Sequence, residues 1–213
     1  MASRILLSAA FLAALTGAAV AAPVTVGSYT FDSSAYADIS SKHLGTIGNA
    51  GGMSNNDLSM FAVMGAGSVI RFEFIDNGLV NGIGDDILVF ETSTSTNSSV
   101  SISASGNGGF ISGHLRESVL GSELLGSSYS SYHVNIFGFD LTELSVAANA
   151  SFSSPLYLMA SSGVLGSSAG ISQAVAYNST ISAVPLPAAL PLLSVSIAGL
   201  GFIGWLRQRW ARS

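Results

Sequence analysis

The stretch Val69-Ile70-Arg71-Phe72-Glu73-Phe74-Ile75 alternates apolar and charged residues in its central part with a period of two. On an extended chain, Ile70, Phe72 and Phe74 share one face, and the two charged residues between them lie on the other. This alternation is typical of a β-strand that has one buried face and one solvated face. The stretch therefore predicts that at least part of the chain is built from half-buried strands.

Similar short stretches recur along the chain and are separated by Gly, Asn and Ser turn residues. We expect further strands at residues 24–31, 58–64, 86–91, 99–105, 132–139, 156–160 and 171–177. No segment between the two ends of the chain keeps a helical period for long, although residues 114–125 and 140–144 could each hold a short helix. Short strands with regular turn signals predict an all-β fold, a single β-sandwich or jelly-roll-like domain.

The charge and cysteine content of residues 22–183 argue against a nucleic-acid-binding protein and against a disulfide-stabilised domain. Residues 22–183 contain all 12 acidic residues of the chain but only three cations, Lys42, Arg71 and Arg116, so that 3 − 12 gives a net charge of −9. A nucleic-acid partner is not expected, because phosphate binding needs a basic surface. The chain has no cysteine, so this domain must fold by core burial without disulfides, which its length allows.

The densest polar segment runs from Asp76 to Asp86 and combines Asp, Asn and Gly. Calcium takes 6–8 oxygen ligands, often from carboxylates and amides, and the spacing is not that of an EF-hand. Alternatively, the same side chains cap turns by hydrogen bonding to nearby backbone groups, and both interpretations stay open. The candidate calcium ligands are Asp76, Asn77, Asn81, Asp85 and Asp86, with Glu91 and Asp140 as residues that could complete the site.

No residue pattern selects a catalytic centre. The segment Gly166-Ser167-Ser168-Ala169-Gly170 matches a nucleophile elbow, but no Asp or His follows Ser168 in the chain. His43, His114 and His133 lack the spacing of a zinc-binding helix. We therefore expect no enzyme and name no catalytic residue; a secreted hydrolase remains an alternative without a residue set to support it.

The N-terminus has the three parts of a secretory signal peptide. Arg4 precedes an apolar run over residues 5–15, and Ala19-Val20-Ala21 supplies a small-residue cleavage site. Cleavage one residue later would leave Pro23 at the first mature position, where a cyclic residue fits the peptidase poorly. We therefore expect residues 1–21 to be removed by signal peptidase after Ala21, and the domain of residues 22–183 to be exported.

The C-terminus combines a short motif, an apolar span and a basic cluster. Val184-Pro185-Leu186-Pro187-Ala188 begins the segment, and residues 188–206 are almost purely apolar. That length is enough for one transmembrane helix. The basic cluster of residues 207–213 contains Arg207, Arg209 and Arg212, which predicts a cytoplasmic C-terminus by the positive-inside bias. We expect a single-pass inner-membrane intermediate whose domain lies outside that membrane.

Motif, span and arginines in this order resemble the PEP-CTERM sorting signal in its VPLPA variant, over residues 184–213. Such tails occur on exported proteins of Gram-negative bacteria that make exopolysaccharide. The resemblance implies that an exosortase-type membrane protease recognises the tail and processes it near residues 184–188. It also implies delivery to the cell-envelope surface or the extracellular space.

A looser resemblance lies inside the domain. Residues 74–77 and 81–91, together with the later Gly138-Phe139-Asp140-Leu141, are similar to a pattern of exported PEP-CTERM-type surface proteins. This resemblance implies a β-sandwich and favours a metal-assisted loop, but it implies no catalytic activity.

Taken together, these patterns predict an exported surface or extracellular-matrix protein with a structural or interaction role, linked to exopolysaccharide or biofilm. The alternative is a calcium-assisted carbohydrate-binding module. Such a module needs exposed aromatic side chains, for which the candidates are Tyr129, Tyr132, Tyr157 and Tyr177; residues 22–183 contain no Trp.

Overall fold

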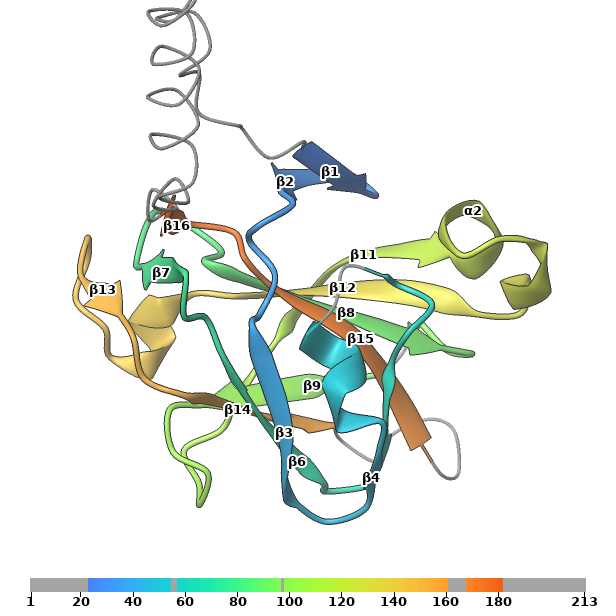
Figure 1. Cartoon of the computed structure of the whole chain (residues 1–213), viewed down its shortest axis with the longest axis horizontal. Coiled ribbons are helices and arrows are strands. Elements are labelled where there is room, and N and C mark those ends of the chain that lie inside the picture. Colours follow the sequence, from blue (N-terminus) through green and yellow to red (C-terminus); the bar gives the residue numbers. More distant parts are fainter. Residues whose placement is uncertain (1–22, 55–56, 97, 161–167, 182–213) are drawn as a thin grey trace, which may run out of the picture. The chain divides into compact units, whose positions relative to one another are not determined.

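The computed structural model of the chain describes residues 23–54, 57–96, 98–160 and 168–181. All of them belong to one compact unit, Ala21–Ser182. The described residues form mainly β-strands with a few short helical turns (Figure 1). The all-β fold class predicted from the alternating stretches is therefore confirmed.

The described strands are short and follow one another closely along the chain. They are β1 (Pro23–Val26), β2 (Tyr29–Asp32), β3 (Ile39–Leu44), β4 (Ile47–Gly48), β5 (Ala62–Gly65), β6 (Val69–Glu73), β7 (Asn77–Val80), β8 (Ile87–Ser93), β9 (Val100–Ser103), β10 (Ile111–Ser112), β11 (His114–Leu120), β12 (His133–Phe139), β13 (Ser151–Phe152), β14 (Leu156–Ala160), β15 (Ser168–Ala176) and β16 (Ser179–Ile181). The helical turns are η1 (Ala50–Ser54), α2 (Gly121–Leu124), η2 (Ser127–Tyr129) and η3 (Leu141–Leu144).

Two antiparallel sheets form the body of the described unit. One has five strands in the order β10-β9-β14-β6-β3, and the other has six in the order β11-β12-β8-β15-β5-β4 (Figure 1). Ile70 and Phe72 of the first sheet and Val89 and Phe137 of the second belong to one hydrophobic cluster. The alternation in the stretch that begins at Val69 thus places its apolar face in the cluster that the two sheets share.

The six-stranded sheet is also covered on its other face. Leu88 and Phe90 of β8 belong to a second hydrophobic cluster, together with Val26 and Phe31 of the β1–β2 hairpin and with Tyr36. Every residue of β8 is buried. A strand buried on both faces needs apolar residues at successive positions rather than alternation, which explains the unbroken run from Ile87 to Phe90.

Several sequence-based element predictions were wrong. Residues 24–31 form a hairpin rather than one strand, because Gly27 adopts a positive φ of 58° and turns the chain. The short helix expected within residues 114–125 is present as α2, but residues 114–120 before it form strand β11, which pairs with β12. The strand predicted from residue 58 begins at Ala62. Strand β7 lies inside the predicted 76–86 loop, where it pairs with β13 and β16.

Candidate functional site

Asp86 connects three segments that are far apart in the sequence. Its side chain is fully buried. Oδ1 accepts hydrogen bonds from the Gly82 backbone N at 2.7 Å and from Asn178 Nδ2 at 3.0 Å, and Oδ2 accepts one from the Leu141 backbone N at 2.8 Å. Hydrogen bonds to a charged acceptor are stronger than neutral ones. The carboxylate therefore holds the acidic loop, the start of η3 and the segment after β15 together.

The backbone of Asp86 reinforces the same junction. Its N–H donates to the Phe139 carbonyl at 2.8 Å, and its carbonyl accepts from the backbone N–H groups of Tyr177 and Asn178 at 2.8 and 3.2 Å. The two parts of the looser sequence pattern, residues 81–91 and 138–141, consequently lie side by side. At Asp86 the structure bears out the turn-capping interpretation of the loop.

Asp85 faces a different partner. Arg116 donates from Nε to Asp85 Oδ2 at 2.8 Å and from Nη2 to Oδ1 at 2.6 Å, and this hydrogen-bonding partner raises the pKa of Arg116. Arg116 lies at a β-bulge of β11, between Leu115 and Glu117, and a bulge re-aims a side chain. The carboxylate packs over Gly138, where a Cβ atom would come within 2.2 Å of Asp85 Oδ2.

The remaining loop residues serve separate local contacts. The pKa of Asp76 is raised by burial and by the adjacent Asp38 carboxyl. Asn77 Nδ2 donates to the Ser34 carbonyl, and Asn81 Nδ2 donates to the carbonyl of Val146 at 2.6 Å.

Asp140 caps η3 by accepting a hydrogen bond from the Thr142 backbone N at 2.7 Å. Like Asp86, it satisfies a backbone donor at the start of a helical turn.

Glu91 lies toward the other end of β8, and its surroundings differ from those of Asp86. Its side chain is buried, and burial raises its pKa, while hydrogen bonds from Ser98 and Asn135 act in the opposite direction. Both donors, Ser98 Oγ and Asn135 Nδ2, bond the same oxygen, Oε2. No ion pair among the described residues involves Glu91. The structure thus separates Glu91 from Asp86 rather than bringing both to one site.

The candidate calcium ligands do not converge. Among residues 23–54, 57–96, 98–160 and 168–181, no group of three or more acidic or histidine side chains is arranged to hold a metal ion. Backbone and amide donors already occupy both oxygens of Asp86, and Arg116 occupies both oxygens of Asp85. A calcium site stays a prediction.

The candidate tyrosines are distributed over three places. Tyr129 and Tyr132 contact each other edge to face with ring centroids 5.8 Å apart, and Tyr157 packs against His43 at 4.7 Å. Tyr177 contacts Tyr29 at 5.6 Å with an interplanar angle of 78°. Of these pairs, only the last includes a tyrosine that is clearly exposed, since 40% of Tyr177 is accessible.

A mixed aromatic and charged surface surrounds Tyr177. Burial raises the pKa of Tyr29, and the charges of Asp85, Arg116 and Glu117 also act on it. We call Tyr29, Tyr177, Asp85, Arg116 and Glu117 the Tyr177 surface. The sequence patterns point only to Tyr177 and Asp85 among these residues. The others come from the β1–β2 hairpin and from β11, and no local pattern places these two segments beside Tyr177.

The terminal candidate sites lie outside the described residues. These are the signal-peptidase site at Ala19 and Ala21, the sorting motif of residues 184–188, the span of residues 188–206, and Arg207, Arg209 and Arg212. They stay predictions. Within the described part of the chain, no helix has the length and apolar character needed to cross a bilayer.

Comparison of the chain with protein-family models, with curated proteins and with solved structures gives no significant match.

Proposed function

We propose that the protein is an exported cell-surface or extracellular-matrix protein, sorted by an exosortase-type system, with a structural or interaction role linked to exopolysaccharide or biofilm. The observation that carries the proposal is the ordered tail, in which Val184-Pro185-Leu186-Pro187-Ala188 precedes an apolar span and three arginines. The N-terminal segment with Ala19-Val20-Ala21 supports export by signal peptidase. The inner membrane then holds the chain briefly or stably before release to the surface.

A β-sandwich is the finer description that we propose for the exported domain. Its support is the hydrophobic cluster to which both large sheets contribute, through residues such as Phe72 and Phe137. The buried polar groups favour a structural role over catalysis, because the carboxylates of Asp86 and Glu91 are engaged by hydrogen-bond donors inside the domain. Such a domain presents a surface to partners and needs no cofactor to do so.

Processing of the full chain tests the sorting proposal. The chain is expressed in a Gram-negative bacterium that carries an exosortase-type protease, and the termini of the purified protein are determined by mass spectrometry. We expect a start at Ala22 and a C-terminus near residues 184–188. Pro185→Ala combined with Pro187→Ala should retain the intact tail, whereas the matched control Pro155→Ala should be processed normally. Normal processing of the double variant would overturn the proposal.

A calcium-assisted carbohydrate-binding module is the second candidate, and the Tyr177 surface favours it. An exposed aromatic ring beside a bidentate Asp85–Arg116 pair offers an apolar face and directional hydrogen-bonding groups together. The test is retention of the protein on immobilised polysaccharides, with calcium and with chelator. Tyr177→Ala should abolish retention, and Tyr129→Ala should not; absence of retention for the unaltered chain would contradict this candidate.

A further inference from the structure

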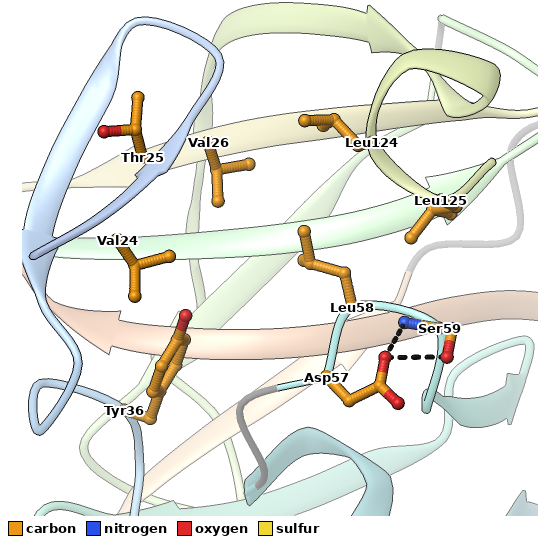
Figure 2. Close-up of a pocket in the computed structure, with 9 residues that line it drawn as sticks. All are labelled: Val24, Thr25, Val26, Tyr36, Asp57, Leu58, Ser59, Leu124 and Leu125. Carbon is orange, nitrogen blue, oxygen red and sulfur yellow. Dashed lines mark hydrogen bonds between the residues drawn. The ribbon is translucent and has the colours of Figure 1, made fainter. Parts of the chain in front are cut away.

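A cavity of about 420 Å³ opens on the face of the six-stranded sheet that carries the β1–β2 hairpin (Figure 2). Its volume falls within the range of small-molecule sites, roughly 300–1,000 Å³. Four segments that are separate in the sequence form its walls: the hairpin, Tyr36 between β2 and β3, the turn before β5, and α2 with the residue after it. The lining residues are Val24, Thr25, Val26, Tyr36, Asp57, Leu58, Ser59, Leu124 and Leu125.

The walls are mainly aliphatic. Val24, Leu58, Leu124 and Leu125 pack against the second hydrophobic cluster but are only partly buried, so each keeps some surface accessible. A ligand that covered these side chains would gain about 25 cal/mol for each Å² of apolar surface removed from water. The cavity therefore favours a ligand whose body is aliphatic.

Tyr36 adds one polar group that faces the cavity. Only 7% of the residue is exposed, its ring contacts Phe31 edge to face at 5.5 Å, and its hydroxyl makes no hydrogen bond to the other described residues. Figure 2 shows that this hydroxyl points into the space between Val24 and Leu58. The hydroxyl is therefore accessible from the cavity, where it can donate to the oxygen of a ligand or of water. Burial raises the pKa of Tyr36, which keeps the phenol neutral and able to donate.

Asp57 places an exposed carboxylate at the edge of the cavity. Its Oδ1 accepts hydrogen bonds from the Ser59 backbone N at 2.9 Å and from Ser59 Oγ at 2.7 Å (Figure 2). These bonds lower the pKa of Asp57, so its carboxylate is ionised at neutral pH. None of the other lining residues is a Lys, Arg or His. The lining thus presents a carboxylate and no cationic side chain to a ligand, which favours a neutral molecule over an anion.

We propose that this cavity binds a small, neutral, mainly aliphatic molecule with one oxygen acceptor, such as an alcohol, an ester or an amide. Its aliphatic part packs against Val24, Leu58 and Leu125, and its oxygen accepts a hydrogen bond from the Tyr36 hydroxyl. The cavity shares no residue with the sorting tail or with the Tyr177 surface. A failure of the ligand proposal would therefore leave the proposed function unaffected, and the reverse also holds.

Photoaffinity labelling of the full chain tests the proposal, because mass spectrometry of the labelled protein identifies which peptides the bound probe has reached. Probe that is not bound to the protein labels no peptide. The probe is an aliphatic alcohol of about ten carbons that carries an alkyl diazirine. We expect label on peptides containing residues 24–26, 57–59 or 124–125, and we expect 1-decanol to compete better than decanoate at pH 7.5. Label spread evenly over exposed apolar positions such as Leu115 and Leu120 would overturn the proposal.

Two variants and a control separate binding from folding. Leu58→Trp fills the cavity and should abolish labelling at these peptides, whereas Ile83→Trp adds the same ring at a fully exposed position and should leave labelling unchanged. Tyr36→Phe removes only the hydroxyl and should weaken competition by 1-decanol about fivefold, the loss expected for one hydrogen bond. Equal labelling of Leu58→Trp, or unchanged competition in Tyr36→Phe at an unchanged melting temperature, would contradict the assigned site.

Discussion

Asp86 and Glu91 are both buried carboxylates on the same stretch of chain, yet their surroundings differ. Asp86 accepts three hydrogen bonds that are shared between its two oxygens and come from three segments. Glu91 accepts two side-chain hydrogen bonds on a single oxygen, and burial raises its pKa. One carboxylate is thus the centre of a junction, and the other is a group whose charge the fold accommodates poorly.

The two carboxylates show that burial alone does not determine whether a carboxylate stabilises or destabilises the folded state. A buried charge is stabilising when donors surround it and costly when they do not. Asp86 lies where loops meet and backbone N–H groups are free to donate. Glu91 lies within a strand, where the backbone groups are committed to the sheet, so only side chains such as Asn135 can reach it.

Removal of the Asp86 carboxylate should have the largest effect. Asp86→Ala would leave the Gly82 and Leu141 N–H groups and the Asn178 amide without their acceptor, and we expect the free energy of unfolding to fall by about 3–5 kcal/mol. Chemical denaturation measures it. Asp140→Ala is the matched control, since it removes a more exposed helix cap that is worth about 1 kcal/mol. Equal losses in the two variants would contradict the central role of Asp86.

Exchange of each carboxylate for its amide should sharpen the contrast, because the two changes should have opposite signs. In Asp86→Asn the new NH₂ group faces N–H donors, which should cost about 2 kcal/mol. In Glu91→Gln the buried charge disappears while an oxygen remains to accept from Asn135, so the melting temperature at pH 7 should rise by a few degrees. A fall in melting temperature for Glu91→Gln would mean that its ionised form is needed.

The pH dependence of the free energy of unfolding measures the contribution of Glu91. Its folded pKa lies above the ordinary value of 4.5, so the protonated folded state is favoured below about pH 4.5 and this contribution is lost as pH rises through the folded pKa. Subtraction of the Glu91→Gln stability curve from that of the unaltered protein should therefore leave a difference that falls with rising pH across this window. A flat difference curve would show that burial does not shift this group.

The surface ion pair should contribute less than either buried carboxylate. Arg116 is about two-fifths exposed in its side chain, so solvent screens its attraction to Asp85. A double-mutant cycle with Asp85→Asn and Arg116→Gln should give a coupling of about 0.5–1 kcal/mol that weakens in 1 M salt. A coupling above about 3 kcal/mol would class this pair with the buried interactions.

Calcium provides the smallest expected effect. Because N–H donors and Arg116 occupy the oxygens of Asp86 and Asp85, we expect melting temperatures with calcium and with chelator to agree within about 1 °C, far below the several degrees that a tightly bound ligand produces in a domain of this size. A clear rise that Asp85→Ala abolishes would instead establish the loop as a metal site.

Strand positions were predictable where the buried face repeats in the sequence. The alternation around Phe72 and the apolar run of β8 both indicate strands, because side-chain burial follows strand geometry directly. Strand β11 was not predictable in this way, since its exposed edge position leaves its residues without a repeating buried face. Its pairing with β12 is a long-range effect.

The candidate site around Asp86 was likewise predictable in its local part and not in its long-range contacts. The density of Asp, Asn and Gly between Asp76 and Asp86 marks a segment in which side chains satisfy backbone groups, and Asp86 does so. Its partners at Leu141 and Asn178 are 55 and 92 residues away. No local pattern could pair them, because the contact exists only once β8, β12 and β15 are adjacent.

By itself, the sequence determined the all-β character, the absence of disulfides, the acidic charge and the expected sorting signals at both ends. These properties depend on composition, on period and on short contiguous motifs. Only the tertiary structure decided which carboxylate is stabilised, that Arg116 meets Asp85, and that a cavity opens beneath the β1–β2 hairpin with the Tyr36 hydroxyl in it. The physical reason is that hydrogen-bond partners, desolvation and cavities belong to groups brought together by strand pairing and not to any one segment of the chain.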